Sequence, residues 1–321
     1  MARGRSFEQK LARLDEISNA PVSPEAMDAL RDTIRGTSSL LAARAAEIAG
    51  HKSLEDLIPD LVVAFDRFMV EQDKQCAAKI AIVDALNKLQ YEGRDLLLRG
   101  IRHVQMEPVW GGQADTAAPL RAECALALAR MGTPEALFEL ATMLFDKQKP
   151  ARLAAPNAIA YLAGDASELV LRVKVMAGDE EAEVIGECFT RLMEIAPDRS
   201  ADFVAGYLDG EDAVVAEHAA LALGQSRTVA AFEILRRRWE DALSSKDKEM
   251  LALPIALTRR DEAVELLIAV ISKERSATAA AAVTALGIYV EEDARRRVRE
   301  AVESRGDPEV AKAYEREFGG G

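Results

Sequence analysis

The stretch that decides the fold runs from Leu120 to Asp146 and reads LRAECALALARMGTPEALFELATMLFD. Its first half is rich in Ala and Leu, which are strong helix formers. Gly132, Thr133 and Pro134 then predict a short turn, with Thr133 as the N-cap and Pro134 as the first residue of a second helix. Apolar residues recur at helical spacing through the second half. The stretch therefore predicts an antiparallel pair of helices.

The same pattern returns 95 residues later, where Val215 to Trp239 reads VAEHAALALGQSRTVAAFEILRRRW. Because 95 is about three periods of 32, further copies are expected between the two stretches. They occur at 152–175 and 184–208, and weaker copies flank the series at 40–68, 76–101, 251–271 and 277–302. About eight helical pairs account for most of the chain.

The length of 321 residues is too great for one compact core, since cores stop growing at roughly 250–300 residues. A line of stacked pairs avoids this limit, because each pair buries its apolar face against its neighbour. We expect a helical N-terminal cap at 1–36, a repeat array at 37–310, and a final helix end with a Gly tail at 311–321. No alternating apolar pattern or Asn-Gly turn predicts a β-strand.

These pairs resemble the HEAT repeat, and in particular its Ala-rich bacterial, phycobilisome-lyase-like subtype. The likeness covers residues 37–310 and is strongest at 118–147 and 212–239. It implies an armadillo-like, right-handed α-solenoid in which small residues let neighbouring helices approach closely. It also implies that the second helix of each pair lines the concave surface. A solenoid of this kind carries no activity of its own, so function depends on the sites placed on it.

Enzymes built on this scaffold set requirements that the sequence does not meet. Hydroxylases on HEAT-like repeats hold two irons through paired His-Glu dipeptides. In this sequence none of His51, His103 and His218 is followed by Glu. We therefore expect no metal and no cofactor, and no phosphate-binding loop or nucleophile elbow motif occurs. A bilin lyase or a DNA-repair glycosylase on HEAT-like repeats stays as the alternative. The glycosylase needs a basic groove with aromatic side chains, which the net charge of −13 opposes.

The charge is unevenly distributed along the chain. Residues 1–224 carry 24 Lys and Arg against 36 Asp and Glu, whereas residues 225–321 carry 17 against 18. Arginines cluster in the second part, at Arg236, Arg237, Arg238, Arg259, Arg260, Arg295, Arg296, Arg297 and Arg299. These clusters fall on or just before second helices, so they predict a positive stripe that binds an acidic segment of a partner protein. Glu and Asp four residues earlier favour the other interpretation, that the arginines only form ion pairs within their helices.

A connection at 104–116, VQMEPVWGGQADT, is longer than the other turns. Insertions in solenoids lie in loops on one face and often carry binding. Trp110 is therefore a candidate partner-binding residue. The alternative is that Trp110 fills a gap between the weak and the strong repeats.

Three widely spaced cysteines argue against a disulfide framework and a zinc knuckle, and no stretch approaches the roughly 20 apolar residues of a membrane span. With no signal-peptide pattern at the start, we expect a cytoplasmic location. The sequence thus predicts a non-catalytic scaffold or adaptor for protein–protein interaction. Its partner is expected to be a protein and not a nucleic acid.

Overall fold

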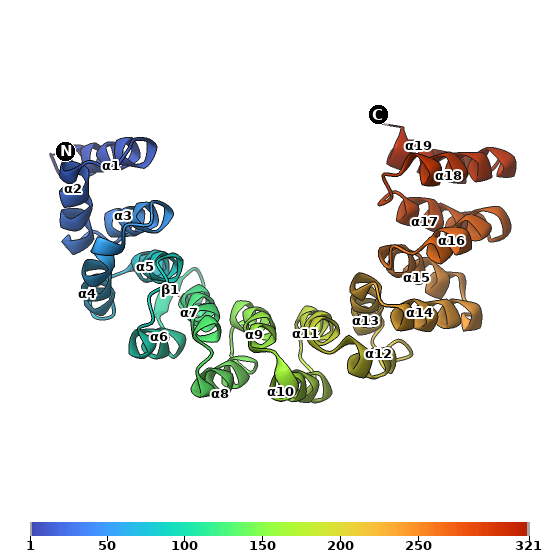
Figure 1. The fold of residues 1–321 in the computed structure, drawn as a ribbon, viewed down its shortest axis with the longest axis horizontal. Helices are drawn as coiled ribbons and strands as arrows, with labels where there is room; N and C mark the ends of the chain where they lie inside the picture. Colours follow the sequence, from blue (N-terminus) through green and yellow to red (C-terminus); the bar gives the residue numbers. More distant parts are fainter. Residues whose placement is uncertain (1, 320–321) are drawn as a thin grey trace. The chain divides into compact units, whose positions relative to one another are not determined.

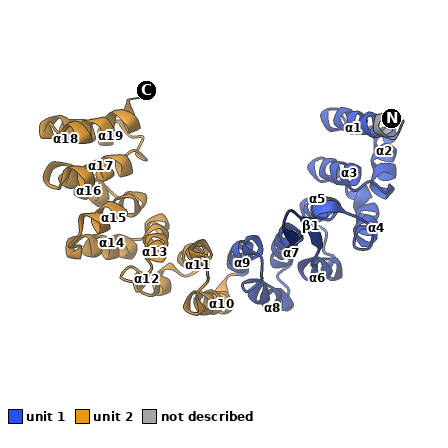
Figure 2. Ribbon diagram, turned by 180° about the vertical axis from the view of Figure 1, so that it is seen from behind, with its two compact units in different colours: residues 1–162 blue, residues 163–321 orange. Residues whose placement is uncertain are grey.

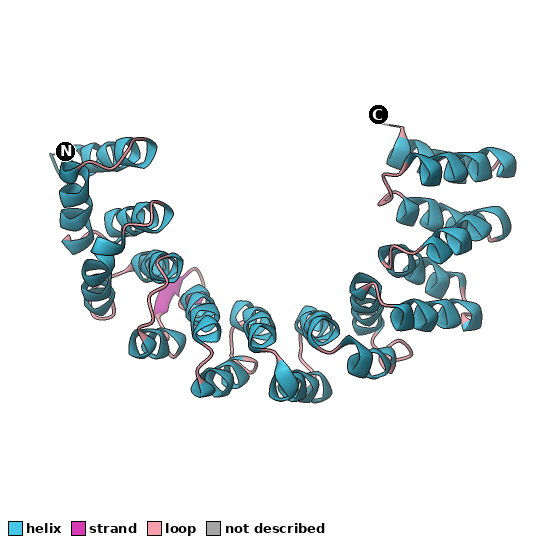
Figure 3. Cartoon of the chain, viewed as in Figure 1, coloured by secondary structure: helices cyan, strands magenta, loops and turns pink. Residues whose placement is uncertain are grey.

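The computed structural model describes residues 2–319, which form 19 α-helices, two short 3₁₀ helices and two β-strands (Figures 1 and 3). Gly320 and Gly321 of the expected tail lie outside these residues. The first half comprises α1 Ala2–Asn19, α2 Pro24–Arg35, α3 Ser39–His51, η1 Glu55–Leu57, α4 Ile58–Phe68, η2 Lys74–Cys76, α5 Ala77–Lys88, α6 Arg94–Ile101, β1 Met106–Val109, β2 Gly112–Asp115, α7 Ala118–Met131, α8 Pro134–Met143 and α9 Lys149–Leu162. The second half comprises α10 Gly164–Ala177, α11 Ala182–Ile195, α12 Pro197–Ala205, α13 Ala213–Ser226, α14 Val229–Asp241, α15 Ser245–Leu257, α16 Asp261–Lys273, α17 Ser276–Leu286, α18 Glu292–Arg305 and α19 Pro308–Phe318.

The chain forms two compact units, residues 1–162 and residues 163–321 (Figure 2). In each unit the odd-numbered helices pack against one another in one layer, and the even-numbered helices form a second layer. Each even-numbered helix packs against the odd-numbered helix that follows it. Every unit is thus a stack of antiparallel helical pairs, which confirms the predicted HEAT-like solenoid architecture.

The predicted period of about 32 residues reappears in the hydrogen bonds between repeats. Arg67 donates from Nη1 to the carbonyl oxygen of Arg35, 32 residues earlier, over a distance of 2.9 Å. In unit 2, the Tyr289 hydroxyl donates to the Ala256 carbonyl, 33 residues earlier, at 3.0 Å. The side chains that hold neighbouring repeats together therefore recur with the sequence period.

Small residues set how closely the odd-numbered helices approach. A Cβ atom added to Gly224 of α13 would lie 2.3 Å from the backbone oxygen of Pro254 in α15, closer than real Cβ contacts. Ala219, Ala220 and Ala222 of α13 are almost fully buried. A stack bends when the helices of one layer lie closer together than the helices of the other layer. The odd-numbered helices accordingly lie on the inner side of each unit's own curve (Figure 2).

This arrangement corrects the expected assignment of layers. The second helix of the quoted stretch, α8, and its counterpart α14 belong to the even-numbered layer, and the Ala-rich first helices α7 and α13 belong to the inner one. Thr228 caps α14 by accepting a hydrogen bond from Ala231 N at 3.2 Å. Thr133 stands at the N-cap of α8 without a side-chain capping bond. The first helices of these two stretches, and not the second ones, therefore lie inside.

Candidate functional site

The connection at 104–116 contains a β-hairpin, so the expectation that the chain has no strands is wrong here. Strands β1 and β2 pair antiparallel from Met106 opposite Asp115 to Val109 opposite Gly112 (Figure 3). Trp110 and Gly111 form the two-residue turn, and Gly111 has a φ of +89°, which a residue with a side chain rarely adopts. In the sequence, the pair Gly111-Gly112 after Trp110 is the signal of this hairpin turn. It stands where many hairpins have Asn-Gly.

The base of this hairpin is fastened to the turn that precedes α5. Glu107 accepts a hydrogen bond from Gln75 N at 2.7 Å. The Gln105 side chain donates to the Asp73 carbonyl at 2.7 Å and accepts from Lys79 Nζ at 2.8 Å. The hydrogen bond from the Gln75 backbone N–H, together with the one from the Gln105 side chain, holds the pKa of Glu107 below its ordinary value. The hairpin is therefore fixed at its base on backbone groups of Asp73 and Gln75 and on the Lys79 side chain of the preceding repeat.

The tip of the hairpin, in contrast, is open to solvent. The Trp110 side chain is fully exposed, at 103% of its reference area, and Met106 and Val109 are each about half exposed. An exposed side chain cannot fill a gap between repeats, so the alternative interpretation of Trp110 is wrong. A large aromatic surface is instead presented on a rigid base.

Buried ion pairs lie next to the base of the hairpin, at the N-termini of α5 and α7. We call this group, Asp73–Lys79 and Asp115–Arg121–Asp146, the ion-pair ladder. Lys79 Nζ lies 3.3 Å from Asp73 Oδ2, and both side chains are almost fully buried. Arg121 lies between Asp115, at 2.9 Å, and Asp146, at 2.8 Å. Because Asp115 is the last residue of β2, the same carboxylate ends the hairpin and belongs to the ladder.

These acids also cap helices, which explains their positions. Asp73 accepts hydrogen bonds from the backbone N–H groups of Ala78 and Lys79 at the start of α5. Burial alone would raise the pKa of Asp115, but N–H donors at Ala117 and Gln105 outweigh burial and hold it below its ordinary value. The ladder was missed in the sequence, although a basic residue follows an Asp by six positions at 73/79, 115/121 and 146/152.

The late arginine clusters lie in the even-numbered layer of unit 2. Arg236, Arg237 and Arg238 belong to α14, Arg259 and Arg260 precede α16, and Arg295, Arg296, Arg297 and Arg299 belong to α18. The prediction that they line the concave surface is therefore wrong. Second helices were expected on the inner side, and these second helices form the other layer.

Most of these arginines already have partners. Arg236 pairs with Glu233 and Glu240, at 2.6 and 2.8 Å, and Arg296 pairs with Asp293 and Glu300, at 2.5 and 2.8 Å. Across repeats, Arg238 pairs with Asp209, and Arg297 pairs with Glu265. Arg259 and Arg295 lie over the rings of Tyr289 and Phe318, and Arg260 contacts Glu262 at 3.4 Å. Among the described residues, Arg237 is exposed and forms no ion pair, and the carboxylate nearest to Arg299 is 3.9 Å away.

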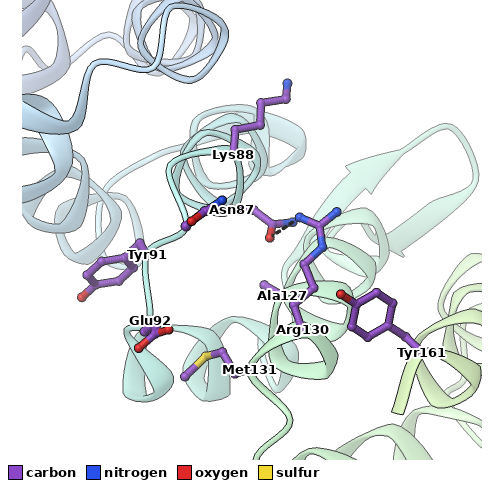
Figure 4. A pocket seen from close by; sticks show the side chains of 9 residues that line it. Asn87, Lys88, Tyr91, Glu92, Ala127, Arg130, Met131 and Tyr161 are labelled. Carbon is purple, nitrogen blue, oxygen red and sulfur yellow. Dashed lines mark hydrogen bonds between the residues drawn. The ribbon is translucent and has the colours of Figure 1, made fainter. Parts of the chain in front are cut away.

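A cavity of about 570 Å³ opens on the inner layer of unit 1, at the C-terminal ends of α5 and α7 (Figure 4). Arg130 Nη1 donates to Asn87 Oδ1 at 2.8 Å, and Tyr161 of α9 reaches the same opening. Lys88 and Glu92 complete a lining with charges of both signs. Lys88 and Arg130 thus share the opening with the Glu92 carboxylate and the Tyr161 ring, so the lining has mixed charge and is not uniformly basic.

Residues 2–319 contain no group of three or more His, Cys, Asp or Glu side chains arranged to hold a metal ion. No helix in this range is both long and apolar enough to cross a membrane. Burial raises the pKa of Cys76 to about 11 and that of Cys188 to about 12, and it raises the pKa of Cys124 further. The three thiols are therefore protonated and buried, as expected for small apolar core residues.

No family model and no curated protein matches the chain. Among solved structures, a mutant of Kap121p is 15% identical with a TM-score of 0.49, covering 92% of this chain and 37% of that one. Human deoxyhypusine hydroxylase in complex with glycerol is 17% identical with a TM-score of 0.31, covering 79% and 89% of the two chains. The complex of CpcE and CpcF of phycocyanin lyase from Nostoc sp. is 15% identical with a TM-score of 0.36, covering 89% and 96%. This chain spans little more than a third of the Kap121p chain, so the HEAT-like assignment rests on its own helical pairs.

Proposed function

We propose that this protein is a non-catalytic scaffold that binds a partner protein, and that the Trp110 hairpin is the element that anchors the partner. The observation that carries the proposal is a fully exposed Trp on a hairpin whose base is held by hydrogen bonds. Trp is enriched among the residues that dominate binding energy at interfaces. Because the base is fixed, little conformational entropy is lost when the tip is buried.

The chemistry of the tip indicates what the partner must offer. An indole ring buries about 150–250 Å², so the partner needs an apolar pocket with room for one aromatic side chain. Met106 and Val109 flank it with further exposed apolar surface. The mixed charge around Arg130 and Tyr161 on the inner layer also favours a protein over a nucleic acid.

An acidic partner segment is a second, weaker part of the proposal. The ion pairs of the late clusters, with the ring contacts of Arg259 and Arg295, leave Arg237 and Arg299 as the groups available to it. Exposed pairs of this kind contribute about 0.2–1 kcal/mol each, so they support binding without anchoring it.

The test is affinity capture from a native lysate with the full chain as bait, comparing wild type with Trp110→Ala. Leu243→Ala is the matched control, because Leu243 lies in the turn between α14 and α15 and is equally exposed, at 102%. We expect the specific partner to be lost with Trp110→Ala and retained with Leu243→Ala, since removing an interface Trp costs about 2 kcal/mol or more, roughly 30-fold in affinity. Equal recovery with all three baits would contradict the proposal.

Intrinsic fluorescence then links any captured partner to the tip. Trp239 is buried in unit 2, whereas Trp110 is open to solvent, so acrylamide quenches mainly Trp110 in the free protein. A bound partner should protect Trp110 from the quencher. Unchanged quenching in the complex would place the interface elsewhere.

A further inference from the structure

Helix α10 carries an exposed apolar stripe on the outward side of unit 2. Leu169, Val173 and Met176 are 61%, 45% and 63% exposed. Their spacing of four and three residues places them on one helical face. The opposite face of α10 is buried in the unit through Leu171 and Val175.

The even-numbered helices that follow α10 supply an internal comparison. Each of them has a buried apolar residue that corresponds to Leu171 of α10. The residues two before, two after and five after it therefore correspond to Leu169, Val173 and Met176. The buried residues are Leu171, Val204, Leu235, Leu267 and Val298. At these positions α12 has Asp202, with Gly206 and Asp209 in the turn that follows the helix, α14 has Glu233, Arg237 and Glu240, α16 has Glu265, Ala269 and Ser272, and α18 has Arg296, Glu300 and Glu303. Only α10 in this series has large apolar side chains at all three, so the repeat pattern does not require them.

A groove of about 570 Å³ borders the stripe, between α10 and α12, and Leu169 belongs to both. Its lining is net acidic, with four carboxylates against Arg172 and Arg199. Asp165 and Glu168 are paired there with Arg199, at 2.8 and 2.5 Å. Asp198 and Asp202, also in the groove, form no ion pair among the described residues. The surrounding segment 163–224 carries four Lys and Arg against 14 Asp and Glu, which is −10 of the net −13.

We propose that α10 and the groove beside it bind a basic amphipathic helix of a partner protein, with apolar side chains on the Leu169–Val173–Met176 stripe and Lys or Arg side chains in the groove. An apolar stripe at helical spacing is the recognition pattern for an amphipathic helix. The negative charge selects a basic one and repels nucleic acid and anionic lipid. Three side chains provide only about a few hundred Å², well below a stable globular interface, so a helical segment suits the surface better than a second copy of the chain.

The probe for the test is a fluorescein-labelled 14-residue amphipathic helix built of Leu and Lys, with a Leu/Glu peptide of the same pattern as its counterpart. Fluorescence polarisation with the full chain should show binding of the Lys peptide that weakens as salt is raised, because exposed charge pairs are screened. The Glu peptide should not bind. Failure of the Lys peptide to bind at 100 µM protein, or equal binding of the two peptides, would overturn the proposal.

Variants then locate the binding surface. Leu169→Ser with Val173→Ser should weaken the Lys peptide about tenfold, as loss of apolar anchors does. Asp198→Asn with Asp202→Asn should weaken it less and reduce its salt dependence. Ala269→Ser on α16, at an equivalent outward position, is the matched control and should bind as wild type does. Equal binding by the Leu169/Val173 variant would place the peptide elsewhere and refute the assignment.

Two further measurements distinguish this surface from the hairpin and from a dimer interface. Trp110→Ala should bind the peptide like wild type, because the inference does not rest on the hairpin. Sedimentation velocity reports whether the stripe joins two copies instead. A dimer that the Leu169/Val173 variant dissociates would show that the occupant is a second copy and would contradict a partner helix.

Discussion

Replacing Arg121 by Ala should destabilise unit 1 more than any change to a surface arginine. The Arg121 side chain is only 4% exposed and lies between the carboxylates of Asp115 and Asp146. It also donates from Nη1 to the His103 carbonyl at 2.8 Å. The variant leaves two carboxylates and a carbonyl oxygen without this donor. Removing one partner of a buried pair costs about 3–5 kcal/mol, because the remaining charge stays desolvated.

Urea denaturation followed by far-UV circular dichroism measures this loss. With a slope of about 2 kcal/mol per M, the midpoint should fall by roughly 1.5–2.5 M. Arg102→Ala is the control, because Arg102 pairs with Glu139 but is 64% exposed, and its midpoint should stay at the wild-type value. Equal midpoints for the two variants would show that the ladder does not stabilise the unit.

The pH dependence provides an independent check. The pKa of Asp115 is held below its ordinary value in the folded protein, so its ionised form contributes stability above the unfolded pKa, about 3.9, and loses it as the pH falls through the folded pKa. Arg121→Ala removes one of the groups that lower this pKa. The difference in the free energy of unfolding between wild type and Arg121→Ala should therefore be constant from about pH 8 to 5 and should decrease below about pH 4. A gap that is the same at pH 3 and pH 7 would refute an electrostatic origin of the loss.

Three further changes test the packing and the charges. Gly224→Ala should lower stability by about 1–3 kcal/mol, because its Cβ would meet the Pro254 backbone, whereas Gly206→Ala, with nothing nearer than 3.4 Å, should not; thermal melts compare the two. Burial and a neighbouring carboxylate raise the pKa of Glu123, so Glu123→Gln should raise stability at pH 7, and this gain should disappear as the pH falls below the raised pKa. Cys188, whose pKa burial raises to about 12, should resist a thiol reagent at pH 8 until the protein is unfolded; rapid native labelling would contradict this.

Helix existence and repeat length could be predicted from the sequence because both depend on local spacing. The Ala and Leu pattern of 120–146 sets the helical faces, and its return at 215–239 sets the period. The layer that a helix joins depends instead on how closely it approaches the neighbouring repeat. The contact between Gly224 and the Pro254 backbone is such an approach, and it joins residues 30 positions apart.

The hairpin and the ladder were missed for different reasons. A four-residue strand containing Pro108 has too few residues to show alternation, and its pairing is supported by Gln75, from another repeat. The ladder did leave a signal, a six-residue spacing from Asp to a basic residue. That spacing identifies a buried pair only once the Asp is known to cap a helix, as Asp73 does for α5.

Residues at the outward positions of the even-numbered helices are informative about function, because the buried packing between helices does not depend on them. The solenoid is held by buried inward residues such as Leu171 and Val204. The outward positions contribute surface ion pairs between repeats, such as Glu265 with Arg297, which stabilise a fold little. Selection for solubility should fill them with charged residues, as on α14 and α18. Large apolar side chains at Leu169 and Val173, which are 61% and 45% exposed, act against solubility, and the same holds for the fully exposed Trp110 at the hairpin tip. In a solenoid whose fold is repeated, the departures from the repeat are therefore where binding should be sought.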